Sequence, residues 1–480
     1  MPSIKKNFLY SSLLTTAGYI FPLITFPYVS RVLGVTNIGI CNFIDSIINY
    51  FIYFSMLGID LVGIREIAKN KSDKEKLKKT FNELFTLNTI TTSIALLLLL
   101  TATLSIDQLT RNWHLMAVGA VKLTMNYMLV EWLYKGLEEF RYITIRTIIV
   151  KAFYVILIFI FIKESSDYPT YYLLTVLSIA INAIINITHS RKFVSLHIGN
   201  IHHLNLGIYL KPVLTIAAYL VLTSMYTTFN VIFLGFVSGE TEVGYYTTGA
   251  KLFQVIMSFF GAFTSVMLPR MSSLVAEGKG IEFRLMLEKS YKILFNFSVP
   301  LLLFSFIYAP FIIEIIAGSG YDGAIVPMRI IIILLLINGY EQIIIIQALA
   351  PLKKDNAIIK NSLIGAATGV ILNLVLVPSQ RSVGSAVVWV ISEFVVLCCA
   401  QYHIHDTLRI CFPWKFLLRA LLINIPLTIM IYLSYQSNLN MIASFICGAS
   451  IVVVYSLFVN IKMINREFLG GKLSVISKAL

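Results

Sequence analysis

Apolar runs of roughly twenty residues, separated by short polar stretches, follow one another along almost the whole chain. A helix needs about 20 mainly apolar residues to cross the hydrocarbon core of a bilayer. The pattern therefore predicts an all-α membrane protein of about fourteen transmembrane helices. We expect these spans near residues 8–29, 39–61, 84–104, 113–133, 145–162, 171–187, 212–236, 243–268, 293–316, 325–349, 362–377, 384–403, 416–434 and 442–460.

The composition agrees with a bilayer as the solvent. Apolar residues make up 58% of the 480 and only 13% are charged, whereas about a quarter of a soluble domain is charged. The spans leave only short connections, which excludes a separate soluble domain and an external catalytic domain. The cysteines show neither C-x-x-C spacing nor a paired layout, so we expect no metal, no disulfide and no cofactor beyond H⁺ or Na⁺ as a coupling ion.

Basic residues gather on one side of the expected membrane. The net charge is +14, and with a cytoplasmic amino terminus 30 of the 38 Lys and Arg residues fall on that side. By the positive-inside rule we expect both chain ends to be cytoplasmic. Residues 63–82 form a cationic helical stretch suited to anionic lipid headgroups, or else a solvated basic loop. This distribution indicates membrane lipids as partners and argues against nucleic acid.

An internal repeat with an offset of 205 residues is visible. Residues 36–39 (TNIG) open the second span and residues 241–244 (TEVG) open the eighth, and each stretch follows a Leu-Gly pair, at Leu33-Gly34 and at Leu234-Gly235. We expect two six-helix lobes, 1–200 and 201–405, related by a twofold axis along the membrane normal. Residues 406–480 would add two further helices and a cytoplasmic tail.

Polar side chains recur at helical spacing in three spans, which places them on one face of each helix. They are Asn42, Asp45 and Asn49 in the second span, Thr223, Thr227 and Asn230 in the seventh, and Thr247, Lys251, Gln254 and Ser258 in the eighth. Polar groups are costly in hydrocarbon, so we expect these faces to line a substrate cavity between the lobes. The alternative is that they join helices by hydrogen bonds.

Isolated charges and prolines add candidates. Lys122 lies near mid-span, where it serves the cavity or an ion pair, whereas Lys151 and Arg31 lie near span ends and could reach the headgroups. Asp45, Glu341 and Glu393 are the candidates for ion coupling, as protonated, ion-paired or proton-relay carboxyls. Pro22 and Pro27 should bend or unwind the first helix, either as a gating hinge or for packing alone.

Several segments in order resemble the polysaccharide-biosynthesis flippases, specifically the O-antigen (Wzx-type) group of the multidrug, oligosaccharidyl-lipid and polysaccharide exporter superfamily. They are residues 30–34 (SRVLG) with Gly39, residues 243–246 (VGYY) with Lys251-Leu252, residues 266–272 (VMLPRMS) and residues 383–386 (VGSA). The resemblance covers nearly the whole chain. It implies two six-helix lobes, often with two more helices, that move substrate by alternating access.

The same resemblance suggests a role for Lys251. In related lipid II flippases an arginine early in the eighth helix meets the lipid pyrophosphate, and Lys251 occupies the matching place. Those relatives carry further arginines in their first two helices that this chain lacks, which argues against a peptidoglycan role. A fixed cation offsets the desolvation of a diphosphate, and Arg31, Lys122 and Lys251 could supply it. The alternative for Lys251 is a structural ion pair with Asp45.

The leading hypothesis, which the resemblance implies, is a flippase for undecaprenyl-diphosphate oligosaccharide in the bacterial inner membrane, acting with or without other polysaccharide-assembly proteins. A drug/cation antiporter of the same superfamily would favour acidic residues in the first span, which has none. A membrane-embedded polymerase or transferase would need a large external loop or a His/Asp pair. Only His202-His203 and His403 to Asp406 invite that idea, both on the expected cytoplasmic side and without a catalytic motif nearby. We therefore expect a transporter and not an enzyme.

Overall fold

The computed structural model describes residues 4–195, 206–437 and 439–467. These residues are almost entirely helical and contain no strand, which confirms the all-α prediction. Ten helices in this part of the chain are long and apolar enough to cross a membrane, and the bent pair α17 (Trp414–Ile423) and α18 (Ile425–Tyr435) would make eleven. The chain is therefore a multi-pass membrane protein.

Two of the helices are long enough for two crossings each. The first, α1 (Ile4–Met56), has 53 residues and a non-helical break at Gly34. The second, α16 (Asp355–Leu408), has 54 residues and a break at Arg381. Each of these two helices is counted once among the ten, although its break divides it into two parts. The expected number of fourteen spans therefore stays a prediction.

The chain divides into two compact units. Unit 1 holds residues 1–248, 316–323 and 362–389, and unit 2 holds residues 249–315, 324–361 and 390–480. This grouping reflects how closely segments pack, whereas the lobes expected at 1–200 and 201–405 reflect the repeat. The lobes, and residues 406–480 as an appended pair of helices, stay predictions.

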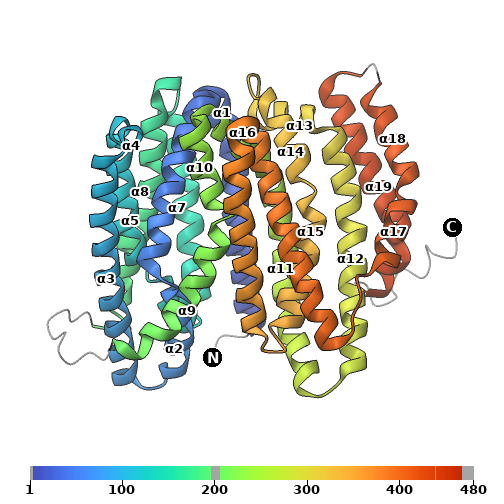
Figure 1. The fold of residues 1–480 in the computed structure, drawn as a ribbon. Helices are drawn as coiled ribbons and strands as arrows, with labels where there is room; N and C mark the ends of the chain where they lie inside the picture. Colours follow the sequence, from blue (N-terminus) through green and yellow to red (C-terminus); the bar gives the residue numbers. More distant parts are fainter. Residues whose placement is uncertain (1–3, 196–205, 438, 468–480) are drawn as a thin grey trace. The chain divides into compact units, whose positions relative to one another are not determined.

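Unit 1 is a helical bundle. Besides the whole of α1 it contains α2 (Ile59–Asn70), α3 (Lys74–Ser105), α4 (Asp107–Arg111), α5 (Trp113–Met128), α6 (Glu131–Gly136), α7 (Phe140–Phe161), η1 (Ser165–Asp167), α8 (Tyr168–Ser190), α9 (Gly207–Ser224) and α10 (Thr228–Ser238). Helices α1, α3, α5, α7 and α8 pack against one another (Figure 1). In the cationic stretch 63–82, α2 and α3 meet at a turn where the Asp73 carboxylate accepts hydrogen bonds from the Glu75 and Lys76 backbone N–H groups, so the expected helical structure is present.

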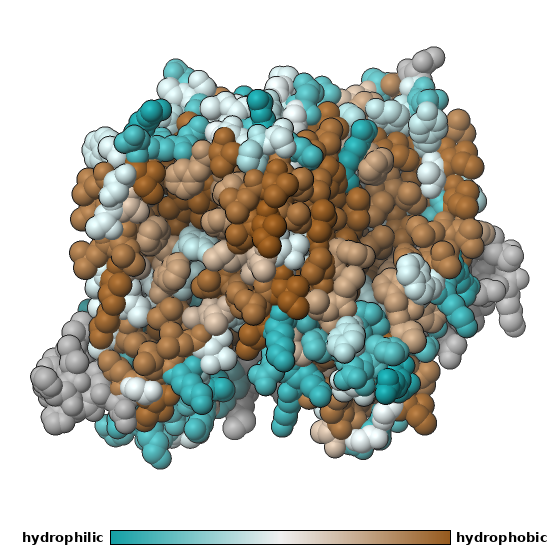
Figure 2. Space-filling model, viewed as in Figure 1, coloured by the Kyte–Doolittle hydropathy of each residue, from teal (hydrophilic) through white to brown (hydrophobic). Residues whose placement is uncertain are grey.

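Unit 2 is arranged around α12 (Gly280–Ile307). The chain enters it through α11 (Glu240–Ala276) and continues in α13 (Ala309–Ala317), η3 (Asp322–Ala324), α14 (Ile325–Ile331), α15 (Leu334–Gln342), the π-helix η4 (Ile343–Leu349), parts of α16, α17, α18 and α19 (Met441–Glu467). The Tyr308 hydroxyl, at the end of α12, hydrogen-bonds Ser434 and Ser444 at 3.0 Å and so ties α18 and α19 to it. In each unit, apolar side chains cover the middle of the helices and hydrophilic side chains gather at their ends (Figure 2), as lipid exposure requires.

Candidate functional site

The 205-residue repeat appears as direct contacts in unit 1. The hydroxyl of Thr36 lies 2.9 Å from that of Thr241, and the Asn42 amide donates a 2.9 Å hydrogen bond to the Thr247 hydroxyl. Both pairs are 205 residues apart. Residues related by a twofold axis can contact each other only where they lie close to that axis. The start of the second half of α1 and the first turns of α11 therefore contact each other through residues at matching positions of the repeat, as the predicted twofold axis would require.

Two glycines allow this close packing. A Cβ atom on Gly39 would collide with the carbonyl oxygen of Glu240, and a Cβ atom on Gly244 would collide with the carbonyl oxygen of Val35. Gly39 and Gly244 are 205 residues apart, and so are Val35 and Glu240. The contact is thus reciprocal, as in an isologous interface, and its geometry requires glycine at both positions.

The backbone repeats at the turns before these segments. Gly34 has φ 75° and ψ 169°, and Gly239, its counterpart at the same offset, has φ 86° and ψ 172°. This region of φ/ψ space is essentially open to glycine alone. The sequence match of Leu33-Gly34 with Leu234-Gly235 was therefore wrong by four residues. Gly235 instead allows the ring of Phe43 to pack closely against α10, because a Cβ atom at this position would collide with that ring.

A further matched pair holds the turns of two other helical hairpins. The Asn37 amide donates to the carbonyl of Ser165, in the turn before α8, at 2.7 Å. The Glu242 carboxylate, at the same offset from Asn37, accepts from the Ser382 backbone N–H at 3.2 Å and pairs with Arg381 at 3.7 Å, at the break in α16. Sequence reading missed this pair, since an amide and a carboxylate look unrelated in a letter-by-letter match.

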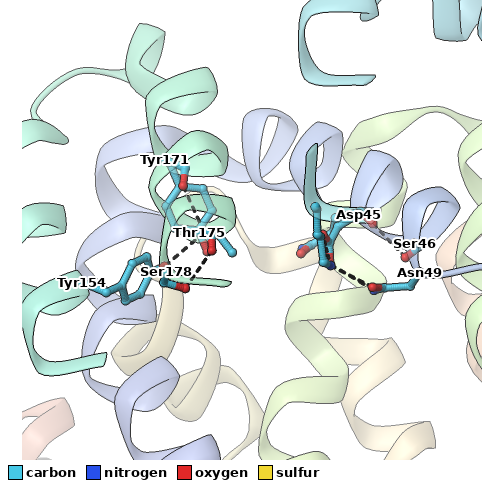
Figure 3. Close-up of polar contacts among 9 residues, drawn as sticks. Asp45, Ser46, Asn49, Tyr154, Tyr171, Thr175 and Ser178 are labelled. Carbon is cyan, nitrogen blue, oxygen red and sulfur yellow. Dashed lines mark hydrogen bonds and ion pairs between the residues drawn. The ribbon is translucent and has the colours of Figure 1, made fainter. Parts of the chain in front are cut away.

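The polar face of α1 takes part in a buried ion pair inside unit 1. The Lys122 ammonium on α5, whose side chain is 8% exposed, lies 2.6 Å from Asp45 Oδ1 and 2.8 Å from Asn49 Oδ1. The Asn49 amide in turn donates to Asp45 Oδ2 at 3.1 Å (Figure 3). This is the ion-pair role expected for Lys122 as one of two possibilities, and it gives Asp45 a different partner from Lys251.

A second polar network joins α7 to α8 in unit 1 (Figure 3). The Tyr154 hydroxyl lies 3.2 Å from that of Thr175, Thr175 donates to the carbonyl of Tyr171, and Ser178 donates to the carbonyl of Thr175. The spacing of 171, 175 and 178 is the same helical signal that revealed the other faces. This signal is therefore detectable from the sequence of the sixth span, although it was not among the predicted polar faces.

The polar residues of the seventh span lie on α9 and α10 and are bonded within unit 1. Asn230 is fully buried, and its amide donates to the Tyr246 hydroxyl at 3.1 Å and to the Ser385 carbonyl at 2.8 Å. The hydroxyl groups of Thr223 and Thr227 donate to carbonyls of their own helical turn. For Asn230 these contacts correspond to the alternative of joining helices.

Unit 2 carries the remaining candidates. Lys251 and Ser258 on α11 are partly exposed and Gln254 is exposed, with Ser258 donating to the Val255 carbonyl. The two acids Glu341 and Glu393, on α15 and α16, contact each other through their carboxyl groups. Asn338 donates to Glu393 at 3.3 Å and lies one turn before Glu341, so the structure brings together two acids that sequence analysis treated separately.

The first half of α1 contains the hinge candidates and Arg31. The helix keeps helical φ/ψ angles through Pro22 and Pro27, so it does not unwind there, and a bend or hinge at these prolines stays a prediction. The break in α1 lies at Gly34, between the first two expected spans, where glycine permits a positive φ. Arg31 is exposed, and its guanidinium donates to the Pro27 carbonyl at 2.6 Å. Lys151 on α7 points toward the same half of α1, since its Nζ lies 4.0 Å from the Cβ position of Gly18.

Some expectations concern residues that the structure does not describe. His202-His203 and both chain ends, residues 1–3 and 468–480, lie outside the described residues. Within the part that is described, no group of three or more His, Cys, Asp or Glu side chains could hold a metal ion.

Comparison with known proteins decides the family. Residues 4–275, more than half of the 480, match the family described as "Polysaccharide biosynthesis protein". The chain belongs to the polysaccharide biosynthesis protein family. The chain is similar to the "Putative O-antigen transporter" of Escherichia coli (strain K12). The two are 25% identical over 334 residues, which cover 68% of this chain and 79% of that one.

Solved structures show the fold of this polysaccharide biosynthesis family member. The one described as "Lipid II flippase MurJ, inward closed conformation" aligns with a TM-score of 0.77 at 15% identity, covering 95% of this chain and 99% of that chain. An inward-facing multidrug resistance MATE family transporter of the MOP superfamily aligns with a TM-score of 0.61 at 15% identity, covering 83% and 98%. The expected MATE- and MurJ-like helical fold is confirmed.

Proposed function

We propose that this protein is a flippase that moves a lipid-linked oligosaccharide, such as an undecaprenyl-diphosphate O-antigen unit, from the cytoplasmic to the external leaflet of a bacterial inner membrane. The observation that carries this proposal is the match to the polysaccharide biosynthesis family over residues 4–275. The name of the Escherichia coli relative and the fold shared with a lipid II flippase support it. The one-sided distribution of basic residues supports cytoplasmic chain ends.

The chemistry of such a substrate explains the cations within the spans. A diphosphate that leaves water loses its hydration, and a fixed ammonium or guanidinium compensates for part of that loss. Lys122 is already neutralised by Asp45. We assign diphosphate contact first to Lys251, because it lies on the polar face of α11, with Gln254 and Ser258 on the same face as partners for sugar hydroxyls. Lys122 holds Asp45 and Asn49 in unit 1.

Ion coupling, where the cycle uses it, is best supported at Glu341 and Glu393. Two carboxyl groups in contact cannot both be ionised without strong repulsion, so the pair is suited to binding a proton or a cation. A drug/cation antiporter is the second candidate function, because the likeness to a multidrug transporter favours the same fold. Such an antiporter would recognise cationic drugs and would not need Lys251.

Transport by purified protein tests the proposal. The full chain is reconstituted in vesicles containing a fluorescent polyprenyl-diphosphate saccharide, and the fraction that becomes accessible to a membrane-impermeant quencher is followed. We expect transfer of this lipid and no transfer of a cationic dye. Transfer of the dye alone would establish the antiporter, and absence of both would overturn the flippase.

A further inference from the structure

A polar pocket in unit 2 has no part in the contacts described so far. Its volume is about 420 Å³, and it lies between the turn that precedes α16 and the C-terminal end of the same helix. Its lining includes four basic side chains. Lys353 and Lys354 come from the turn, Lys360 lies near the start of α16, and His403 lies near the end of α16. Its lining therefore includes His403 and Asp406, the two ends of a stretch that the sequence marked as a candidate without a role.

The backbone around the pocket is arranged to present these groups. Lys353 adopts a left-handed conformation with φ 56°, which is unfavourable for a residue with a long side chain. The backbone N–H groups of Lys353 and Lys354 donate hydrogen bonds to the carbonyls of Ala350 and Leu349, at the end of the preceding helix. Strained residues of this kind persist where the surroundings fix them, often beside ligands.

The start of α16 adds hydrogen-bond donors. This helix has no side-chain N-cap, and the first backbone N–H groups of a helix have no partner within it. Asp355 and Asn356, the first two residues of α16, line the pocket. The direction of the helix dipole favours an anion here, in addition to the three lysines.

The pocket also has acceptors. Asp355 and Asp406 contribute carboxylates, and Asn356 and Thr407 contribute an amide and a hydroxyl. In the part of the chain that the structure describes, none of the three lysines is within ion-pair distance of either aspartate. A bare polyphosphate would be repelled by the two carboxylates, whereas a ligand with both phosphate and hydroxyl groups can use the whole lining.

We propose that this pocket binds the sugar-phosphate headgroup of the lipid-linked saccharide at the cytoplasmic surface, before the headgroup enters the membrane. The proposal rests on the proposed flippase function and extends it with a capture site. The lysines hold the phosphate, and the aspartates, Asn356 and Thr407 accept or donate to sugar hydroxyls. Its place at the ends of α16, where the apolar span begins, lets the polyprenyl chain stay in the bilayer.

The first experiment measures binding to the purified full chain in lipid nanodiscs. The probes are a panel of hexose and N-acetylhexosamine 1-phosphates, inorganic phosphate, and vesicles of phosphatidylglycerol. We compare the wild type with Lys354→Ala/Lys360→Ala and with the matched control Lys74→Ala/Lys79→Ala, which removes two exposed lysines from the start of α3. At least one sugar phosphate should bind the wild type, with about tenfold weaker binding to the pocket variant and unchanged binding to the control.

The second variant tests the sugar contacts. Asp406→Asn removes one negative charge, so phosphate alone should bind as well or better, while the preference for sugar phosphate over phosphate should fall severalfold. An equal response to all probes would overturn the sugar site, and so would an effect confined to the phosphatidylglycerol vesicles, which would make the pocket a lipid-headgroup site. Absence of binding by the wild type would also overturn it.

Failure of this site and failure of the flippase proposal give different results. If the protein transfers lipid-linked saccharide in vesicles but the pocket variants bind all probes like the wild type, only the capture site is wrong. If no saccharide lipid is transferred and sugar phosphate still binds in a lysine-dependent way, the pocket stands and the flippase proposal falls.

Discussion

The hydroxyl oxygen of Thr36 lies 2.9 Å from that of Thr241, its counterpart 205 residues further along the chain. Gly39 and Gly244 pack on each other's segments in the same reciprocal way. The contacts between the second half of α1 and the first turns of α11 are thus reciprocal, as they are beside a local twofold axis, and the twofold relation of the whole lobes stays a prediction. The contact lies within unit 1, since residues 240–248 belong to that unit.

The glycines at this axis should be intolerant of any side chain. Gly39→Ala and Gly244→Ala each force a methyl group into a backbone carbonyl, which cannot rotate away. Overpacking typically costs about 1–3 kcal/mol, and a backbone obstacle should place these variants at or above the upper end. We expect less folded protein in the membrane and a lower unfolding temperature in detergent. Gly261→Ala is the control, because no atom lies within 4 Å of its Cβ position and alanine favours a helix.

The same contact offers a site for a reversible cross-link. In a background without the native cysteines, Thr36→Cys/Thr241→Cys should form a disulfide on oxidation, since the two side-chain oxygens are already adjacent. If export requires these segments to separate, the cross-linked protein should stop exporting polysaccharide and recover after reduction. Each single cysteine variant is the control. Export that continues at full rate in the cross-linked protein would show that the segments stay together.

Sequence reading found the repeat but aligned part of it incorrectly. The TNIG and TEVG stretches gave the correct offset because their polar residues and glycines meet at the axis. Leu234-Gly235 misled, since a two-letter match carries no information on φ, whereas Gly34 and Gly239 share nearly the same φ and ψ. The break at Arg381 falls in the gap between the spans expected at 362–377 and 384–403, but the positive φ of this arginine is imposed by its surroundings and leaves no local signal.

Helical spacing located the polar faces without revealing which neighbours they meet. Asp45 and Asn49 were found because their spacing puts them on one face, but their contact with Lys122 joins residues more than 70 positions apart. Which of several in-span cations would pair with Asp45 depends on how α5 packs against α1. The pairing of Glu341 with Glu393 is of the same kind.

Removing one partner of the Asp45–Lys122 pair should be more damaging than removing both. Lys122→Met leaves the Asp45 carboxylate, whose side chain is 31% exposed, without its cation. Breaking a fully buried pair costs about 3–5 kcal/mol, and the partial exposure of Asp45 should lower this figure. The double variant Asp45→Asn/Lys122→Met should recover much of the lost membrane protein level. If both single variants and the double variant reach wild-type levels, the pair does not stabilise the fold.

The orientation in the membrane can be checked with single cysteines at exposed positions. Ser72→Cys lies in the turn between α2 and α3, and Arg111→Cys lies at the end of α4. The positive-inside rule places the first in the cytoplasm and the second outside. In intact cells a membrane-impermeant maleimide should label only Arg111→Cys, and in broken cells both variants should react. Labelling of Ser72→Cys in intact cells would reverse the topology and move the sugar-phosphate pocket to the external face.

Among the cations within the spans, Lys251 is the one whose replacement should reduce polysaccharide export most. It shares one face of α11 with Gln254 and Ser258, and Asp45, the carboxylate that the sequence suggested as its structural partner, is held by Lys122. Lys251→Ala should abolish surface polysaccharide while the protein still inserts in the membrane, because a diphosphate leaving water loses its compensating charge. Lys251→Arg should keep partial activity, since guanidinium also binds phosphate, although with a planar geometry. Lys279→Ala, which removes an exposed cation outside the spans, is the control and should export normally. Normal export by well-inserted Lys251→Ala would exclude the anchoring role, and a parallel loss of protein level and export would assign Lys251 to stability.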